Sequence, residues 1–515
     1  MESHAIKRFF GLVILAAVVS GGFYFFFKKK EQEKIITYST SDAKNLKGQI
    51  SIALDSWIGY FPFRSPVFGN LMRKAGFRIK IIDDRADYAS RMKMLKKGRI
   101  NFAVCTVDSY ILNGAPANFP GVIVMIIDES KGGDALVSRS RTIRNIDQLK
   151  RSKNFKIAFT PGSPSEHLLK SLAVHFDVPI LKIKDAKWRV EVNGAKEAYN
   201  KLKKGEVALA ALWEPYVAEA KSLPGATKII GSEDMDKLIV DILLVSRQFA
   251  KKSPQLVKLF LKNYFETLNM YNAAKTRLKQ DIMKTYKVTN RQVTYMLRGV
   301  KWKNYPENLQ WYGLTGQTTF KQPLVVASIK STVEIFLGIK DFTSNPIPDK
   351  DPYTLLNSSY LKDLYNINTY KRSTTSEVDT LTKRFSRLST SGWNRLKVVG
   401  ALKLRPITFR TGTFKLDENG KKQLNQIVQN IRHYPNFRIF VKGHTGLRGD
   451  PEANMKLSLQ RAKAVKKELQ FTFNIHTNRI RYLGFGSKEP LSKQVGESDR
   501  SYNNRLKRVE ILFVK

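Results

Sequence analysis

Residues 437–462 read FRIFVKGHTGLRGDPEANMKLSLQRA, and this stretch decides the fold of the last region of the chain. Apolar residues alternate over 437–441, which predicts a strand because successive side chains of a strand point to opposite faces. A glycine-rich turn follows, and a helix is expected beyond it. On that helix Asn454, Ser458 and Arg461 stand at i, i+4 and i+7 and therefore share one face. The stretch predicts a strand, a turn and a helix that presents one guanidinium group.

The flanking sequence predicts a complete α/β unit over residues 397–515. An amphipathic helix is expected upstream from apolar residues at i, i+3, i+4 and i+7, namely Leu424, Ile427, Val428 and Ile431. Pro435 ends that helix. The motifs at 408–412, 443–450, 484–486 and 507–511, in this order, closely resemble the OmpA-like peptidoglycan-binding domain. The resemblance implies a C-terminal α/β domain that binds the cell wall.

The same resemblance implies which residues bind. The family's matching arginine, here Arg461, grips a carboxylate of the diamino acid in the peptide stem, and guanidinium suits this because it binds carboxylate through two parallel hydrogen bonds. The family's aspartate in the His-Thr-Asp turn, which receives the stem's ammonium group, is Gly446 here. Asp450 is a candidate substitute. The expected peptidoglycan-binding residues are Arg461, Asn454, Ser458, Thr445 and Asp450, and the alternative is a retained fold that binds the wall poorly.

An internal echo organises residues 49–340. The sequence LKKG at 95–98, which precedes an apolar stretch at 102–104, recurs at 202–205 before an apolar stretch at 209–211. DALVSR at 134–139 is echoed by DILLVSR at 241–247, at the same offset. Two matches at one offset predict two α/β lobes of similar build, each with a helix–glycine–strand step and a later strand. Two such lobes enclose a cleft, where small ligands bind.

This region resembles the periplasmic binding proteins for nitrate, sulfonates, taurine and thiamine precursors. The resemblance rests on DSWIGY at 55–60, SKGGDALV at 130–137, IDQL at 146–149 and LWEPY at 212–216. It implies a two-lobed fold that closes on a small solute without catalysis. The aspartate that the family often has after the glycine is Asn101 in the first lobe and Ala208 in the second, so the ligand itself is not inferred.

Candidate solute contacts follow from the ends of the predicted strands. Ser163 or Ser165 can cap a helix whose free N–H groups would suit an anionic headgroup. Trp57 and Trp213 follow strand ends in the two lobes, where aromatic walls sandwich ligands. Glu214 completes the expected set. An ordinary helix cap for each serine and a packing role for each tryptophan are the structural alternatives.

The N-terminal sequence predicts a membrane anchor. Residues 9–27 contain no charge and are long enough to cross the hydrocarbon layer. The apolar run continues past the small residues that could mark a cleavage site, so an uncleaved signal anchor is expected. The predicted organisation is a cytoplasmic tail (1–8), a transmembrane helix (9–27), a spacer (28–48), a solute-binding domain (49–340), a linker rich in Ser, Thr, Asn, Asp and Pro (341–396) and an OmpA-like domain (397–515).

Composition limits the function classes. The chain has 89 basic and 44 acidic residues, and this net charge of +45 attracts polyanions without choosing among them. No zinc-finger spacing or RNA-recognition signature is present, so nucleic acid is not an expected partner. The lone Cys105 lies in an apolar run and is expected to be a buried thiol. No catalytic triad, nucleotide-binding loop or metal-ligand spacing is found, so neither an enzyme nor a cofactor or metal site is predicted.

These observations predict an inner-membrane, single-pass protein with most of its chain in the periplasm. It would bind peptidoglycan and capture or sense a small solute, as a substrate-binding protein of ABC-transporter type, with an ABC permease or another envelope complex as a candidate partner. The main alternative is a structural tether between membrane and wall whose lobes serve as a scaffold. A MotB-like stator is disfavoured, because residues 9–27 lack the ionisable group that ion transfer needs.

Overall fold

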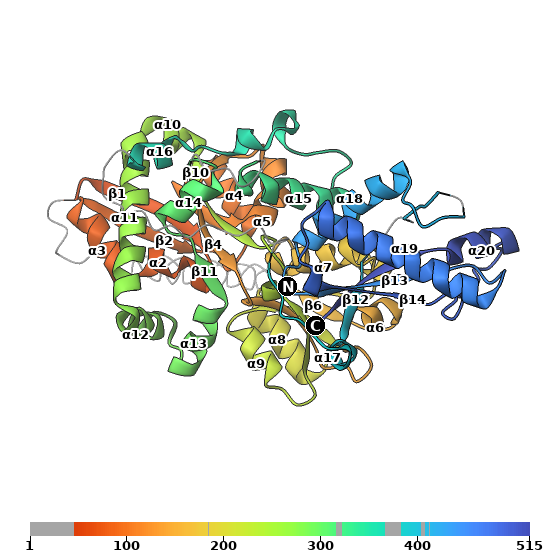
Figure 1. Ribbon diagram of the computed structural model, residues 1–515. Helices are drawn as coiled ribbons and strands as arrows, with labels where there is room; N and C mark the ends of the chain where they lie inside the picture. Colours follow the sequence, from red (N-terminus) through yellow and green to blue (C-terminus); the bar gives the residue numbers. More distant parts are fainter. Residues whose placement is uncertain (1–45, 184, 316–321, 366–382, 403–406, 411) are drawn as a thin grey trace, which may run out of the picture. The chain divides into compact units, whose positions relative to one another are not determined.

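The computed structural model describes residues 46–515 except 184, 316–321, 366–382, 403–406 and 411 (Figure 1). The predicted tail, the predicted transmembrane helix at 9–27 and nearly all of the spacer lie outside the described residues. None of the described helices is long and apolar enough to cross a bilayer. Residues 46–49 and 72–78 belong to a small unit of their own, in which the Lys47 N–H donates to the Gly76 carbonyl oxygen (2.7 Å). Residues 50–71 and 79–515 form the large unit.

The first lobe is built on a six-stranded sheet in the order β11-β4-β10-β3-β1-β2. Its strands are β1 (Gly48–Leu54), β2 (Phe77–Asp83), β3 (Phe102–Thr106), β4 (Gly121–Ser130), β10 (Val240–Ser246) and β11 (Val300–Trp302). All ten residues of β4 are buried, as expected for a central strand that is covered on both faces. The early helices of this lobe are α2 (Phe61–Arg64), α3 (Pro66–Lys74), α4 (Tyr88–Lys96) and α5 (Val107–Gly114).

The second lobe is built on a five-stranded sheet in the order β7-β6-β8-β5-β9. Its strands are β5 (Asp134–Ser138), β6 (Ile157–Phe159), β7 (Arg189–Glu191), β8 (Leu209–Trp213) and β9 (Thr227–Gly231), and its helices are α6 (Ile146–Arg151), α7 (Pro164–His175), α8 (Ala195–Lys204) and α9 (Tyr216–Lys221). Ala135 and Val137 of β5 pack toward α8 and α9, whereas Leu136 packs on the opposite face with α6 and α7. The alternation along β5 therefore buries both faces of the sheet.

The internal echo does correspond to two lobes of similar build, but the two motifs of each half lie in different lobes. The two helix–glycine–strand steps do lie in different lobes, and both glycines adopt positive φ, 66° at Gly98 and 78° at Gly205. The later strand of each half, however, crosses to the other lobe: β5 pairs antiparallel with β8, and β10 pairs antiparallel with β3. The lobes are thus similar in build, with the matching orders β4-β10-β3 and β9-β5-β8, but they exchange one strand each.

The chain passes between the lobes next to Ser232, which ties two crossover segments together. Its hydroxyl oxygen accepts hydrogen bonds from the backbone N–H groups of Gly132 (2.8 Å) and Asp134 (3.1 Å), and it lies 2.8 Å from the Ser130 hydroxyl. Residues 130–134 and 231–240 are therefore hydrogen-bonded side by side where the lobes meet.

Helices of the middle region pack mainly on the first lobe, and the helix at 324–339 also contacts α7 of the second lobe. They are α10 (Arg247–Lys252), α11 (Pro254–Ala273), α12 (Lys275–Tyr286), α13 (Asn290–Arg298), α14 (Tyr305–Trp311), α15 (Leu324–Ile339) and α16 (Ser359–Tyr365). Residues 342–365 fall within the range expected for a linker, yet they pack on this lobe. Leu355 and Leu361 are fully buried, and the Asn357 N–H donates to the Ile123 carbonyl oxygen (2.9 Å).

The C-terminal region has the predicted α/β fold. Its sheet has the order β12-β15-β13-β14, formed by β12 (Val398–Ala401), β13 (Arg438–Gly443), β14 (Ile480–Gly484) and β15 (Val509–Val514). Its helices are α17 (Thr390–Arg395), α18 (Glu418–Arg432), α19 (Pro451–Phe471) and α20 (Asp499–Leu506). Helix α19 lies close to the sheet because Gly443 and Gly484 carry no side chain. A Cβ at Gly443 would lie 2.1 Å from the Ser458 carbonyl oxygen.

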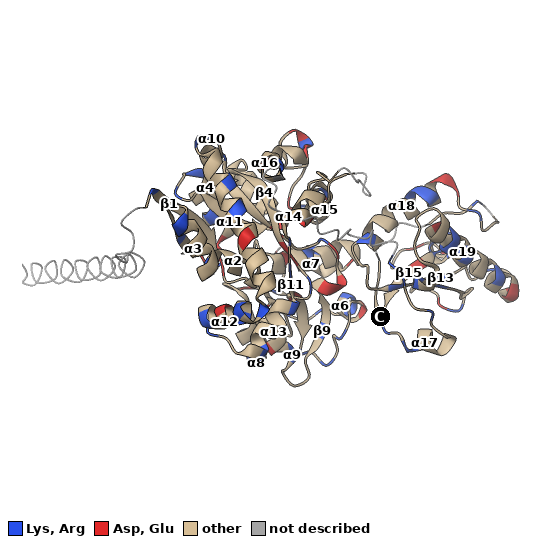
Figure 2. Cartoon of the chain, turned by 60° about the vertical axis from the view of Figure 1, so that its left-hand side comes forward, with Lys and Arg blue, Asp and Glu red and all other residues tan. Residues whose placement is uncertain are grey.

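The C-terminal region shares its apolar core with the second lobe. Phe176, which follows α7, contacts Tyr434 and Phe513 edge-on, and the His175 ring lies 2.8 Å from the Tyr434 hydroxyl. Because this core is continuous, neither part is treated below as an independently folding fragment. Figure 2 shows that basic residues occur on helices of the lobes and of the C-terminal region alike, so the positive charge is not confined to one part.

Candidate functional site

Side chains from both lobes line a cavity beside the crossover segments. The first lobe contributes Asp55, Trp57, Tyr60, Tyr88, Thr106 and Asp241, and the second contributes Asp134, Pro164 and Trp213. The cavity measures about 20 Å³, which is room for roughly one water molecule. The lobes are therefore closed on one another, and a larger solute could enter only if they separated.

The two predicted tryptophans come together here. Trp57 is buried and donates from its indole nitrogen to Asp128 (3.2 Å), while its ring covers Gly133, where an added Cβ would lie 2.3 Å from the ring. Trp213 reaches the same cavity from the end of β8 in the other lobe. The prediction that these residues lie on opposite sides of one cleft therefore agrees with their positions.

Carboxyl groups, which sequence reasoning did not single out, dominate the cleft. Asp134 begins β5 and Asp241 lies at the matching place on β10, and both are buried. Burial raises the pKa of Asp134 to about 7, although the Ser130 hydroxyl donates to it (2.5 Å). Burial also raises the pKa of Asp128 to about 8, and that of Asp241 rises for the same reason and because Asp128 is adjacent. At neutral pH these three carboxyl groups are therefore partly protonated, because burial penalises their charged form.

A buried ion pair lies next to the cleft and fixes one of its lining residues. Arg91, which is fully buried on α4, donates to Asp55 (3.1 Å) and through Nε to Asp84 (2.7 Å). Burial raises the pKa of Asp84 even beside this guanidinium. Asp55 in turn accepts the backbone N–H of Trp57 (3.0 Å), so Arg91 holds the loop that carries the first tryptophan.

The predicted anion site at the start of α7 is already occupied by the protein itself. The Ser163 hydroxyl caps the helix by accepting from the Ser165 N–H (3.2 Å), which is the structural role named as the alternative. Pro164 has no N–H, and the Gly162 N–H donates to the Glu166 carboxylate (2.8 Å). Glu166 thus places a carboxylate at this end of the helix. The Ser165 hydroxyl has no partner among the described residues.

Glu214 does not belong to the lining of this cavity. It is buried, its carboxylate accepts the Ala218 N–H at the start of α9 (3.0 Å), and burial raises its pKa to about 7. Its geometry is that of a residue that caps α9.

The predicted wall-binding arginine, Arg461, forms one backbone hydrogen bond and one ring contact. Arg461 projects half-buried from α19, lies over the Phe409 ring (5.2 Å to the centroid) and donates from Nε to the Thr413 carbonyl oxygen (3.3 Å). Its partial burial lowers its pKa. No carboxylate in the described part of the chain pairs with it, so both terminal nitrogens of the guanidinium remain for an anionic ligand.

The other predicted wall-binding residues have distinct roles. Ser458 is buried against the sheet and accepts the Gly486 N–H (2.9 Å), Asn454 donates to the Arg448 carbonyl oxygen (3.0 Å), and Asp450 caps α19 through the Ala453 N–H (2.7 Å). These three residues shape the turn and the helix, and Asp450 and Arg461 are the two charged members of the predicted set that form no ion pair among the described residues.

The sequence did not point to Asn503, whose carboxamide lies where the side chain of the family's aspartate would extend from position 446. A Cβ at Gly446 would lie 2.2 Å from the Asn503 carboxamide oxygen, which accepts the Leu447 N–H (3.0 Å). Next to it, the buried hydroxyl of Thr445 has no partner among the described residues. Thr445 and Asn503 thus provide polar oxygen atoms in the turn. No local motif could have revealed Asn503, because it lies 57 positions after Gly446 on α20.

Comparison with known proteins agrees with the C-terminal fold. Residues 408–504 match the model of the OmpA family. Over 100 residues the chain is 27% identical to "Outer membrane protein Omp38" of Acinetobacter baumannii, a match that covers 19% of this chain and 28% of that protein. Over 99 residues it is 30% identical to "Peptidoglycan-associated lipoprotein" of Buchnera aphidicola, covering 19% of this chain and 57% of that protein. The chain thus spans less than two thirds of each relative.

The lobes are similar to solved binding proteins. The aliphatic sulphonate binding protein SsuA of Escherichia coli is 17% identical, with a TM-score of 0.45, and the likeness covers 60% of this chain and 98% of that one.

Proposed function

We propose that this chain is a non-catalytic envelope protein that holds the peptidoglycan stem through its C-terminal domain and binds a small solute between its two lobes. In this proposal residues 9–27 anchor it in the inner membrane, residues 49–340 form the periplasmic solute-binding domain, and residues 397–515 reach the wall. An ABC permease or another envelope complex is the candidate partner. The match of residues 408–504 to the OmpA family supports the wall-binding part.

The observation that carries the wall-binding proposal is the uncommitted guanidinium of Arg461. A half-buried cation without a carboxylate partner is costly unless a ligand completes it, and a stem carboxylate would accept two parallel hydrogen bonds from it. The stem's ammonium group would then face the turn at Thr445 and Asn503. Asp450 remains available as an exposed carboxylate at the start of α19.

Replacing Arg461 with alanine should reduce co-sedimentation of the full chain with purified sacculi by about tenfold or more, because a charge-assisted hydrogen-bonded pair contributes roughly 1.5–3 kcal/mol. The matched control is Lys463→Ala, an exposed cation two residues further along the same helix, which should leave sedimentation within about twofold. Equal yields for wild type and Arg461→Ala would remove Arg461 from this role.

For the solute, the geometry favours an organic cation. The cleft combines aromatic side chains from both lobes with the carboxyl groups of Asp134 and Asp241. Asp128, which pairs with Asp241 across β4 and β10, is buried behind them, and its Oδ2 has no partner among the described residues. Aromatic faces and carboxylates both attract a cation, whereas they repel an anion. The sequence left the ligand open, with an anionic headgroup as one possibility, and the proposal names a cation instead.

Calorimetric titration of the detergent-purified full chain should show binding of agmatine, putrescine or choline and none of taurine or nitrate. Binding of the cation should tighten between pH 6 and pH 8, because Asp134, with a pKa of about 7, ionises over that range. Asp134→Asn should weaken binding and reduce the pH dependence. Binding of the anions but not of the cations would overturn this assignment.

One observation favours the second candidate function, a structural tether whose lobes act as a scaffold. The cavity between the closed lobes holds roughly one water molecule. If none of a broad panel of small cations, anions and neutral solutes produces heat on titration, the scaffold is the better description.

A further inference from the structure

A large hollow lies at the end of the second lobe's sheet that faces away from the solute cleft. The parallel strands β6 and β8 both run toward the cleft, where β8 ends at Trp213. Lys156 and Ala208, which directly precede these strands, line the hollow, and so does Ser140, which follows β5. The hollow has a volume of about 1190 Å³, far more than the cleft offers, and it is separate from it.

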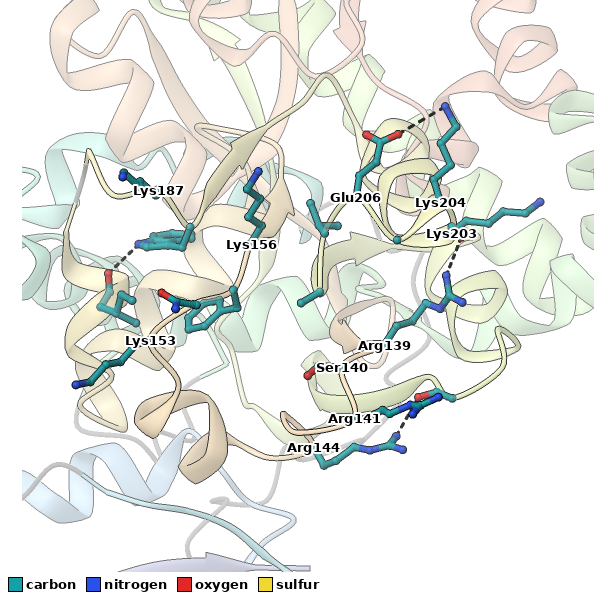
Figure 3. Close-up of a pocket in the computed structure, with 18 of the residues that line it drawn as sticks. Arg139, Ser140, Arg141, Arg144, Lys153, Lys156, Lys187, Lys203, Lys204 and Glu206 are labelled. Atoms are coloured by element: carbon teal, nitrogen blue, oxygen red, sulfur yellow. Dashed lines mark hydrogen bonds and ion pairs between the residues drawn. The ribbon is translucent and has the colours of Figure 1, made fainter.

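Basic side chains from several loops surround this hollow (Figure 3). Arg139, Arg141 and Arg144 come from the loop after β5, and Lys203 and Lys204 come from the end of α8. Lys153 and Lys156 come from the loop before β6, and Lys187 comes from the loop before β7. Glu206 is the single acidic residue among the described residues of the lining.

These cations are almost entirely without counter-charges. Among the described residues, Lys204 pairs with Glu206 (3.7 Å), and that glutamate is shared with Lys201 (3.1 Å) outside the lining. The other seven basic residues of the lining form no ion pair in the described part of the chain. These basic side chains line the rim of one concave volume, and a concave wall that carries charge of one sign raises the potential inside it.

Two of the guanidinium groups are held in place by the backbone. Arg139 donates to the carbonyl oxygen atoms of Leu202 (2.9 Å) and Lys203 (2.7 Å), and Arg144 donates to the carbonyl oxygen of Gly225 (3.0 Å). In each case the bonds to the carbonyls use one terminal nitrogen, Nη1. The remaining donors stay fixed near the hollow, so a ligand would not have to order these side chains.

The lining also has an apolar part. Phe155 and Trp188 are buried in the wall, and the Trp188 indole nitrogen donates to the Ile180 carbonyl oxygen (2.8 Å). Ile183 is 56% exposed beside them. An organic body could lie on this surface while charged groups reach the rim.

We propose that the hollow binds an organic ligand that carries at least two phosphate groups, either a soluble polyphosphorylated compound or a diphosphorylated lipid headgroup. Seven unpaired cations around one cavity call for several negative charges, and phosphate supplies more charge per group than a carboxylate. Fixed guanidinium donors suit phosphate oxygen atoms because they form forked hydrogen bonds. This proposal stands independently of the solute cleft and of wall binding.

The internal echo provides a matched test. Lys203 and Lys204 line the hollow, while the echoed Lys96 and Lys97 precede Gly98 at the same place in the first lobe and lie outside it. The variants Lys203→Glu/Lys204→Glu and Lys96→Glu/Lys97→Glu change the net charge of the full chain equally. Tripolyphosphate is titrated by calorimetry at physiological salt, and detergent micelles doped with cardiolipin or with phosphatidylcholine form the lipid arm.

At least one phosphate probe should bind saturably, about tenfold more weakly to Lys203→Glu/Lys204→Glu and within about twofold of wild type to Lys96→Glu/Lys97→Glu. Binding of tripolyphosphate identifies a soluble ligand, and binding of cardiolipin alone identifies a headgroup. Melting temperatures verify that both variants are folded. Equal losses in the two variants, or no saturable binding of either probe, would overturn the proposal.

Discussion

Replacing Arg91 with methionine should lower the free energy of unfolding by about 3–5 kcal/mol, because the change leaves two buried carboxylates without their counter-charge. Arg91 is fully buried and bonds to Asp55 and Asp84, whose side chains are 6% and 8% exposed. It also donates to the Val104 carbonyl oxygen on β3. Methionine approximates the length of the side chain but restores none of these bonds. Urea denaturation followed by tryptophan fluorescence measures the loss.

The control for this experiment is Arg99→Met, an exposed arginine that follows the same helix. Its substitution should change the free energy of unfolding by no more than about 0.5 kcal/mol. The loss in Arg91→Met should shrink when Asp84 is also changed to asparagine, since one of the stranded charges is then removed. A change of under about 1 kcal/mol in Arg91→Met would show that the ion pair does not hold the loop of Asp55 and Trp57.

The second large effect is a pH dependence of stability that Asp134 contributes. Its pKa is about 7 in the folded chain and near 4 when unfolded, so the folded state retains a proton that the unfolded state loses. The stability from this group is complete below pH 4 and is lost as the pH rises toward 7. Each pH unit in that window costs about 1.4 kcal/mol. Asp134→Asn cannot ionise and escapes this loss.

The measurable quantity is the difference in unfolding free energy between Asp134→Asn and wild type. It should shift in favour of the variant by about 2 kcal/mol between pH 5.5 and pH 7. Taking this difference cancels the opposing contribution of His167 and His175, whose pKa values burial lowers and which destabilise the fold as the pH falls below about 6.5. The exposed Asp185→Asn serves as control and should give the same difference at both pH values. A pH-independent difference for Asp134→Asn would contradict the burial of an uncharged carboxyl group in the cleft.

Local patterns predicted the strand and the helices at the centre of the C-terminal domain, and the family resemblance supplied the rest of its fold. The alternation at 437–441 became β13, and the helix expected from Asn454 is α19, which begins at Pro451. The spacing that placed Ser458 beside Arg461 was correct for the backbone, yet Ser458 turned out to be buried against Gly486. Helical spacing fixes which residues share a face, but it does not say which edge of that face the sheet covers.

The remaining features depend on contacts between residues far apart in the chain, which the sequence patterns do not specify. The echo identified two similar lobes, but it could not show that β5 and β10 are exchanged, because both arrangements give the same sequence repeat. Asp134 and Asp241 are the first residues of the repeated motif at 134–139 and 241–247, but the repeat alone did not show that both carboxyl groups line one cleft. The basic hollow could not be predicted from the sequence either, because loops that are far apart in the chain form it.

Co-sedimentation of the full chain with sacculi before and after chemical amidation of their carboxylates tests the central claim most directly. Amidation removes the acid groups that Arg461 is proposed to grip and leaves the glycan strands intact. The proposal predicts that binding falls to the level of Arg461→Ala and that amidation has no further effect on that variant. Undiminished binding of wild type to amidated sacculi would contradict it.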